Sequence, residues 1–257
     1  MRKSSSLRVL ILAHAFPPQV GGVETHLWDI SQHLCARGHT VLCLVGGASG
    51  EQNYGDVDVV RRPALTVEHL LGERKLLGQR ERSETLRSRL QCIIESVLAR
   101  FKPDIAHAHN LIHFAPELAE AMNESCAGLP IVTSVHDRVG EHLFPEVITL
   151  PWAHTLFASH FLQANLPRCF PSSVLWLGIE LERFAPYGSH DDRFEDMQRP
   201  IIFHPARLLR WKGVEIGFDA FSTLRKRLGM GTLVMCGSEK AATDQEEILV
   251  LRQSITA

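Results

Sequence analysis

Histidines gather at two places where the sequence predicts that a strand ends. One is Asp104-Ile-Ala-His107-Ala-His109-Asn110, and the other is Thr133-Ser-Val-His136-Asp137. Residues two apart share a strand face, so His107 and His109 are expected to point the same way. Imidazoles there can bind a polar ligand or a metal ion, whereas a single histidine is by default a core residue bonded to backbone. No carboxylate or cysteine completes a recognisable metal-ligand spacing with His107, His109 and His136, so we predict hydrogen bonding and no metal.

A glycine pair lies between the first predicted strand and the first predicted helix, in Pro17-Pro-Gln-Val-Gly21-Gly22-Val-Glu24. Glycines at a helix start let backbone N–H groups approach a phosphate, and the helix dipole favours the anion. A turn that only reverses the chain is the alternative. The pattern is not G-x-G-x-x-G, so it does not favour a nicotinamide cofactor.

Three cationic residues lie between a later predicted strand and the helix that follows it, in Pro205-Ala-Arg207-Leu-Leu-Arg210-Trp-Lys212-Gly213. This is the same position in a strand–helix unit as that of the glycine pair. Cations at a helix N-terminus oppose the helix dipole, so the helix alone gives no reason for them. A bound diphosphate would give one, with arginine as a bidentate fork and lysine as a point charge. A solvated basic loop is the alternative.

These three kinds of segment lie at strand ends only if strands and helices alternate along the chain, and the apolar pattern predicts that they do. Continuous apolar runs predict buried strands, and apolar positions at spacings of three and four predict helices. The predicted strands are 7–13, 40–45, 57–60, 104–107, 130–135, 153–158, 173–177, 201–204 and 233–236, and the predicted helices start near residues 23, 86, 115, 214 and 246. Residues 63–83 are expected to form a loop with a short helix.

This alternation predicts an α/β fold with doubly wound parallel sheets. We predict an N-terminal Rossmann-like domain over 1–185, a polar linker over 186–199 and the start of a second domain over 200–257. The second domain is only two strand–helix units long. The sequence therefore looks cut within that domain, or it relies on a partner chain to cover an open sheet edge.

Composition excludes several classes of protein. The chain has 257 residues and a formal net charge of −2, so it lacks the basic excess of a nucleic-acid binder. Six scattered cysteines without a C-x-x-C pair indicate buried free thiols in a reducing compartment. Arg8 interrupts the first apolar run and no cleavage site follows it, so we predict a cytoplasmic first strand and not a signal peptide.

Taken together and in order, these segments resemble the family-4 glycosyltransferases of GT-B fold. The resemblance covers nearly the whole chain. It is carried by Phe16-Pro-Pro-x-x-Gly21-Gly22-Val-Glu24, Gly38-His39-x-Val41, the segments ending in His109 and in His136-Asp137, Leu177-Gly-Ile-Glu180-x-x-x-Phe184-x-Pro186, and Ala206-Arg207-Leu208-x-x-x-Lys212-Gly213.

The resemblance implies two Rossmann-like domains facing a cleft, and transfer of a sugar from a nucleotide-sugar to an acceptor hydroxyl with retention of configuration. No cofactor or metal is required. The first domain would bind a carbohydrate or lipid-linked acceptor and the second the donor. The implied roles are donor diphosphate binding by Arg207, Lys212, Gly21 and Gly22, catalytic sugar contacts by His109 and His136, and acceptor contacts by Glu24, Asn110 and Asp137. Neither histidine is assigned as a general base.

One family element does not match. The family carries two glutamates eight residues apart near a Pro-Ser, and Glu239 and Glu247 have that spacing without its context. Acidic residues opening a helix explain them better. The chain alone is therefore expected to transfer little or no sugar. A non-catalytic or split-enzyme subunit and a GT-B-type epimerase or phosphorylase are the alternatives.

The donor base, the sugar, the acceptor and the oligomeric state cannot be determined from the sequence. Membrane association is also open, because some relatives bind membranes through a basic helix. The basic residues expected around one helix are Arg74, Lys75, Arg80, Arg82, Arg87 and Arg89. They are interleaved with glutamates, so a solvated mixed-charge face is the preferred interpretation over peripheral membrane contact.

Overall fold

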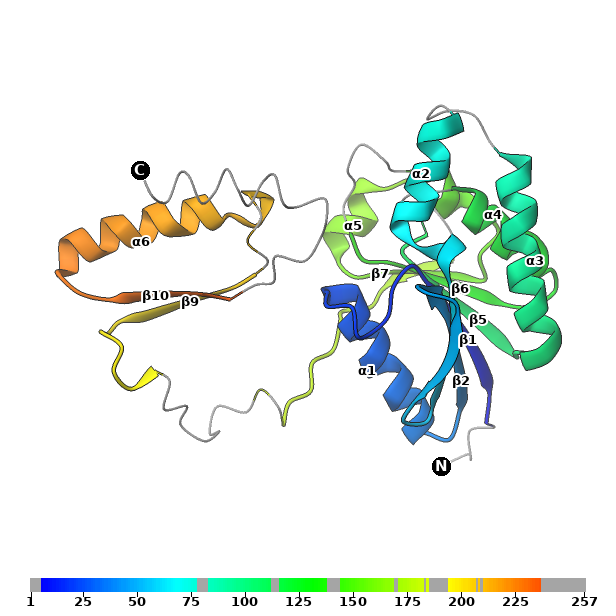
Figure 1. The fold of residues 1–257 in the computed structure, drawn as a ribbon, viewed down its shortest axis with the longest axis horizontal. Coiled ribbons are helices and arrows are strands. Elements are labelled where there is room, and N and C mark those ends of the chain that lie inside the picture. Colours follow the sequence, from blue (N-terminus) through cyan, green and yellow to red (C-terminus); the bar gives the residue numbers. More distant parts are fainter. Residues whose placement is uncertain are drawn as a thin grey trace. The chain divides into compact units, whose positions relative to one another are not determined.

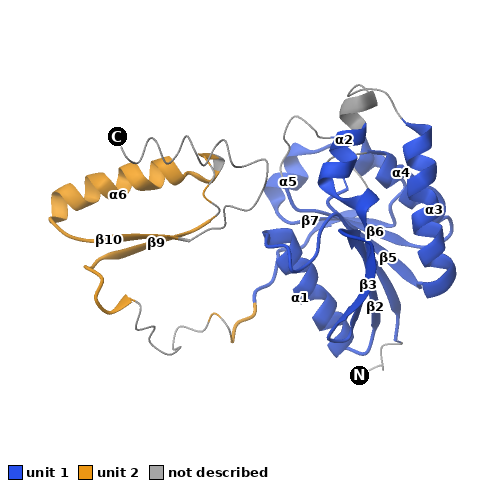
Figure 2. Cartoon of the chain, in the orientation of Figure 1, with its two compact units in different colours: residues 1–179 blue, residues 180–257 orange. Residues whose placement is uncertain are grey.

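The computed structural model describes residues 6–77, 83–111, 116–137, 144–168, 171–182, 184, 194–206, 208 and 210–236. The chain divides into two compact units, residues 1–179 and 180–257 (Figure 2). Most of the predicted linker 186–199 lies outside the described residues, so the predicted domain boundaries stay a prediction.

The first unit is an eight-stranded sheet in the order β3-β4-β2-β1-β5-β6-β7-β8 (Figure 1). All neighbouring pairs are parallel except β3 and β4. The strands are β1 (Arg8–Ala13), β2 (Thr40–Gly46), β3 (Gly50–Tyr54), β4 (Val57–Arg62), β5 (Ile105–His109), β6 (Ile131–Val135), β7 (His154–Phe157) and β8 (Ser172–Val174). The α-helices are α1 (Gly22–Ala36), α2 (Val67–Leu77), α3 (Glu84–Phe101), α4 (Pro116–Ser125) and α5 (His160–Asn165), with short 3-10 helices over Pro63–Leu65 and Pro145–Thr149.

Both faces of the sheet are packed, as the continuous apolar runs predict. In β1, Val9, Ile11 and Ala13 pack with α1, whereas Leu10 and Leu12 belong to the core with α3 and α4. Successive side chains of a strand point to opposite faces, so one strand serves two cores. The parallel sheet with helices on both faces confirms the predicted α/β architecture.

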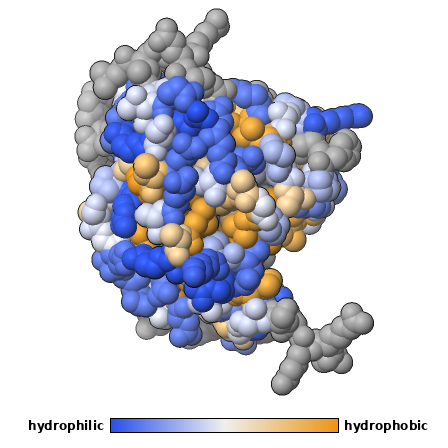
Figure 3. Space-filling model, turned by 90° about the vertical axis from the view of Figure 1, so that its right-hand side faces the viewer, coloured by the Kyte–Doolittle hydropathy of each residue, from blue (hydrophilic) through white to orange (hydrophobic). Residues whose placement is uncertain are grey.

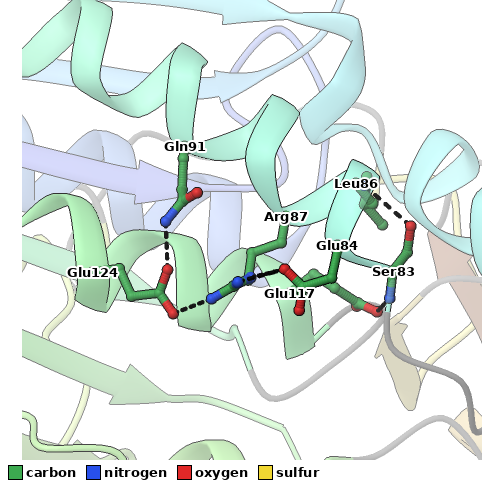
Figure 4. Close-up of polar contacts among 7 residues, drawn as sticks. All are labelled: Ser83, Glu84, Leu86, Arg87, Gln91, Glu117 and Glu124. Atoms are coloured by element: carbon green, nitrogen blue, oxygen red, sulfur yellow. Dashed lines mark hydrogen bonds and ion pairs between the residues drawn. The ribbon is translucent and has the colours of Figure 1, made fainter.

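Polar side chains join α3 to α4 on the outside of this core (Figure 4). Arg87 forms ion pairs with Glu84 of its own helix and with Glu124 of α4, and Gln91 donates to the same Glu124. At the start of α3, the backbone N–H of Ser83 donates to the carboxylate of Glu117, which is buried, over 3.1 Å. Each of the exposed ion pairs of Arg87 contributes little to the free energy of unfolding. Their role is mainly to hold α3 and α4 in one relative position.

The basic residues that we expected around one helix are distributed over two. Arg74 and Lys75 belong to α2, Arg87 and Arg89 to α3, and Arg80 and Arg82 lie outside the described residues. Arg89 pairs with Glu73 of α2 at 3.1 Å, which supports the mixed-charge interpretation. Figure 3, viewed from the side on which α3 lies in Figure 1, shows a largely hydrophilic surface with smaller apolar areas. Among the described residues no helix is both long and apolar enough to cross a membrane.

Three elements differ from the sequence-based expectation. Strand β3 was not expected, because Gly-Glu-Gln-Asn-Tyr is polar and mostly exposed at the sheet edge. Helix α5 is only six residues long and was also missed. Strand β8 ends at Val174, whereas we expected it to reach Leu177; the residues beyond it, Trp176 among them, are exposed.

The second unit contains a parallel pair of strands, β9 (Ile201–Pro205) and β10 (Thr232–Cys236), joined by the 3-10 turn η4 (Arg210–Lys212) and helix α6 (Val214–Leu228). Left-handed glycines bound α6, Gly213 with φ 75° and Gly229 with φ 71°. Such backbone favours glycine, which explains both boundaries. The helix expected over 246–254 and the pair Glu239 and Glu247 lie outside the described residues.

The described cysteines are free thiols, but not all are buried. Cys43 and Cys126 are buried, and burial raises their pKa to about 12 and about 11. Cys92 is exposed on α3, which corrects the expectation of uniformly buried thiols. Its position on the solvent face of an amphipathic helix is the reason. Cys169 and the side chain of Cys236 lie outside the description.

Candidate functional site

The candidate site lies where β1, β5 and β6 end. These three strands are parallel neighbours, so their carboxyl ends meet at one edge of the sheet. Helix α1 starts at the same edge, directly after the loop that follows β1 (Figure 1). In open α/β sheets this edge is where ligands bind.

Four histidines form a cluster at this edge. His107 and His109 follow Ile105 on the face of β5 that packs toward α1, and their ring centroids are 3.9 Å apart, as strand alternation predicts. His136 comes directly after β6, and its Nε2 lies 2.9 Å from Nδ1 of His109. His26 projects from the first turns of α1, with its ring centroid 5.1 Å from that of His136 and 5.8 Å from that of His109.

The cluster is held in a neutral state by burial. Desolvation, with a smaller effect of neighbouring imidazoles, lowers the pKa of His107 to about 3 and that of His136 to about 4, although Asp137 acts to raise the latter. Burial likewise lowers the pKa of His109 well below its ordinary value and that of His26 below it. Each ring therefore offers one N–H and one lone pair at neutral pH.

Two ring nitrogens in the cluster are buried and have no hydrogen-bond partner among the described residues. They are Nε2 of His109 and Nδ1 of His136, on the far sides of the two hydrogen-bonded rings. Whichever ring holds the shared proton, one buried N–H and one buried lone pair remain unsatisfied. Buried polar groups are normally bonded, so the cluster is short of a polar ligand.

Asn110 and Asp137 form the rim of the cluster. Asn110 directly follows β5 in the left-handed conformation, with φ 58°, which asparagine tolerates better than most residues. Its side chain donates to Oδ2 of Asp137 over 2.9 Å and accepts from the backbone N–H of His136 over 3.2 Å. Asn110 thereby ties the ends of β5 and β6 together and orients both His136 and the exposed Asp137 carboxylate.

The glycine pair opens α1 beside this cluster. Gly21 is the N-cap residue, and a Cβ added to it would meet the Glu24 carboxylate at 2.1 Å. Glu24 is the third residue of the helix, where an acidic side chain interacts favourably with the helix dipole. This carboxylate occupies the position that we expected a phosphate to use, whereas nothing lies within 4 Å of a Cβ at Gly22. The space beside Gly22 is therefore open to a ligand.

Arg61 of β4 supports the loop before the glycine pair, a role that the sequence did not suggest. It is buried, its guanidinium donates to the carbonyl of Pro17, and it lies 5.8 Å from the ring centroid of Tyr54. A second donor of the guanidinium lies 3.4 Å from the Gly46 carbonyl. Arg61 thus joins the ends of β2 and β4 to the segment that leads into α1.

The predicted diphosphate residues belong to the second unit. Lys212 ends η4, directly before the left-handed Gly213 and the start of α6, and Arg207 lies outside the described residues. Arg210 forms an ion pair of 3.0 Å with Glu215 in the first turn of α6. That pair gives Arg210 a partner within the unit, so one of the three cations needs no phosphate to explain it.

His26 is the member of the cluster that sequence reasoning missed. The signal was present, because His26 lies three residues after Val23 and one before Leu27, on the side of α1 that faces the sheet. Helical periodicity identifies which side of α1 faces the sheet, but it does not identify which strand that side contacts. Only the strand order β2-β1-β5 places β5 and its histidines against the start of α1.

Comparison with known proteins gives one family match. The family model described as Glycosyltransferase Family 4 matches residues 20–169, which is more than half of the chain and includes α1, β5 and β6. No curated protein matches the chain in sequence.

Solved structures with a similar fold come from several organisms. A trehalose-6-phosphate protein from E. coli bound with UDP-2-fluoro glucose is 14% identical, with a TM-score of 0.60 over 96% of this chain and 68% of that chain. A glycosyltransferase from Rickettsia africae ESF-5 is 16% identical, with a TM-score of 0.61 over 97% of this chain and 66% of that chain. An alpha,alpha-trehalose-phosphate synthase (UDP-forming) from Burkholderia xenovorans in complex with glucose-6-phosphate is 14% identical, with a TM-score of 0.60 over 96% of this chain and 70% of that chain. At these identities the likeness concerns the fold, and this chain spans about two thirds of the length of those proteins.

Proposed function

Because the chain belongs to glycosyltransferase family 4, we propose that it moves a sugar from a nucleotide-sugar donor to an acceptor hydroxyl with retention of the anomeric configuration. The GT-B-like α/β fold expected from the sequence is confirmed by the similar structures. One observation carries the proposal: neutral imidazoles with unsatisfied nitrogens meet the start of α1 at the carboxyl ends of β1, β5 and β6.

In this proposal His109 and His136 are the catalytic residues that contact the sugar. Neutral imidazoles can accept from one hydroxyl and donate to another, and they avoid the cost of a buried charge. The two buried nitrogens that lack partners suit such hydroxyls. Asn110, Asp137 and Glu24 contact the acceptor, and Asn110 also holds His136 in place through its backbone N–H.

The donor diphosphate is assigned to Arg207 and Lys212. In the first unit the open backbone at Gly22 is a further phosphate contact, whereas at Gly21 the Glu24 carboxylate already takes the corresponding space. During transfer the bond between the anomeric carbon and the phosphate oxygen breaks, the acceptor oxygen forms a new bond on the same face, and the acceptor hydroxyl proton passes to the departing diphosphate. Cations beside the departing diphosphate offset its charge, which is often the largest catalytic contribution. No metal or cofactor is needed for these steps.

The proposal is tested by transfer assays with a panel of nucleotide-sugars and sugar acceptors, in the presence of a chelator. UDP-glucose and glucose-6-phosphate are the first probes, because similar structures hold UDP-2-fluoro glucose or glucose-6-phosphate. We expect acceptor-dependent release of nucleotide, a product of retained configuration by NMR, and a loss of about 100-fold in His136→Ala. His33→Ala, an exposed histidine on the same α1, is the matched control and should leave transfer unchanged.

Ligand binding is measured on the same samples, so that the test does not depend on turnover alone. Saturable binding of at least one sugar ligand is expected even where turnover is low. A product of inverted configuration, the same product without acceptor, or no binding across the panel would each contradict the proposal.

A further inference from the structure

We propose that His26, His109 and His136 form a binding site for a divalent transition-metal ion of the Zn²⁺ or Co²⁺ type. The inference concerns binding and does not depend on sugar transfer. It rests on a juxtaposition that the sequence did not reveal, because His26 comes from α1 and the other two histidines come from the ends of β5 and β6.

The geometry is close to that of a three-histidine site. One ring nitrogen from each of His26, His109 and His136 lies within 4.8 Å of the other two. Zinc–nitrogen bonds are about 2.0–2.1 Å, so three nitrogens on one ion are roughly 3–4 Å apart. The facing nitrogens of His109 and His136 are 2.9 Å apart and have to separate slightly, and His26 has to approach these two rings by at most about 1–2 Å.

His26 is the ring that can make this movement. It is half-buried and stands on the first turns of α1, whereas His109 is fully buried and packs against His107 at 3.9 Å between ring centroids. His107 is itself bonded to Ser134 Oγ over 2.7 Å. His109 is therefore held from behind by its packing on His107, and His26 can close on an ion that His109 and His136 hold.

The donor chemistry selects the class of ion. The three ligands are imidazole nitrogens, which suit Zn²⁺, Co²⁺, Ni²⁺ and Cu²⁺, whereas Mg²⁺ and Ca²⁺ prefer oxygen ligands. Imidazoles bind a metal in the neutral form. When an ion takes the two facing nitrogens of His109 and His136, the proton that they share moves to the outer nitrogen of the donor ring, so both rings stay neutral. Three protein ligands leave a fourth position open to water or to a substrate oxygen.

The test is Co²⁺ titration of the untagged, chelator-stripped chain, followed by visible absorption and by competition with Zn²⁺. We expect one Co²⁺ per chain, the d–d absorption of a nitrogen-ligated ion, and displacement by Zn²⁺ but not by Mg²⁺. His26→Ala should weaken binding at least about 10-fold, and alanine suits its helical position.

The matched control is His33→Ala, about two turns further along α1, where the imidazole is exposed and bonded to the Asp29 carbonyl of its own helix. Unchanged Co²⁺ binding by this variant supports the site. Absence of saturable binding, equal binding by His26→Ala, or equal weakening by both variants would overturn it. Thermal unfolding of each variant shows whether the fold is intact, and because no sugar ligand is used, the result is separate from the outcome of the transfer assays.

Discussion

Lowering the pH from 7 to 5 in the presence of a chelator is expected to lower the free energy of unfolding by about 3–4 kcal/mol. The cause is the buried histidine cluster. In the folded chain the pKa of His107 is about 3 and that of His136 about 4, whereas an unfolded histidine titrates near about 6.5.

The sign follows from proton binding. Between these pKa values the unfolded chain binds protons that the folded chain does not, so stability falls as the pH drops below the unfolded value. Each of the two histidines contributes about 2 kcal/mol over this interval, and the lowered pKa of His109 acts in the same direction. Urea unfolding at a series of pH values measures the effect.

The variant His107→Asn should make the stability profile flatter, because it removes one of the groups that titrate. His154→Asn is the control, since this histidine lies outside the cluster and bonds to Ser173 on the neighbouring strand. A free energy of unfolding that stays constant between pH 7 and 5 would show that the cluster is not held neutral by burial.

Gly46→Ala is expected to lower the free energy of unfolding by about 3 kcal/mol or more. Gly46 ends β2, and its N–H donates to the carbonyl of His14 over 3.1 Å. A Cβ there would lie 2.2 Å from the His14 carbonyl oxygen and 2.9 Å from the backbone of Leu65. Backbone atoms on both sides cannot move aside as a flexible side chain would, so the ends of β1 and β2 would have to separate.

Gly72→Ala is the matched control for this prediction. Gly72 lies inside α2, and nothing is within 4 Å of a Cβ added to it. Because alanine favours helices over glycine, this variant should be as stable as the natural chain or more stable by up to about 1 kcal/mol. Equal losses in the two variants, measured by chemical unfolding, would contradict the explanation by backbone contact.

Much of the fold could be predicted from the local pattern of apolar residues, because the residues in that pattern are the ones that become buried. The apolar runs of β1 and β2 indicate strands buried on both faces, and the stripe of Leu86, Leu90 and Val97 indicates the buried side of α3. Strand β3 escaped prediction because an edge strand without a buried face carries no such pattern. Its pairing with β4 is decided by backbone hydrogen bonds, which every residue type can make.

The candidate site could be predicted only in part. His107, His109 and His136 are visible as polar residues that follow strands, and the fold brings them together as expected. His26 and Arg61 could not be assigned to the site in this way, because their importance arises from which strands are neighbours in the sheet. The position of the Glu24 carboxylate over Gly21 is a local side-chain placement that the residue types alone do not determine, and it changes which part of the glycine pair is open to a ligand.

The central claim is that a sugar ligand binds at the carboxyl ends of β1, β5 and β6, in contact with His109 and His136. The most direct test is NMR of the histidine side chains in the chelator-stripped chain during titration with glucose-6-phosphate, UDP-glucose and the wider panel. We predict saturable shifts of the His26, His109 and His136 signals with at least one ligand, while the His33 and His154 signals stay in place. Shifts confined to histidines outside the cluster, or an unchanged cluster across the whole panel, would contradict the account.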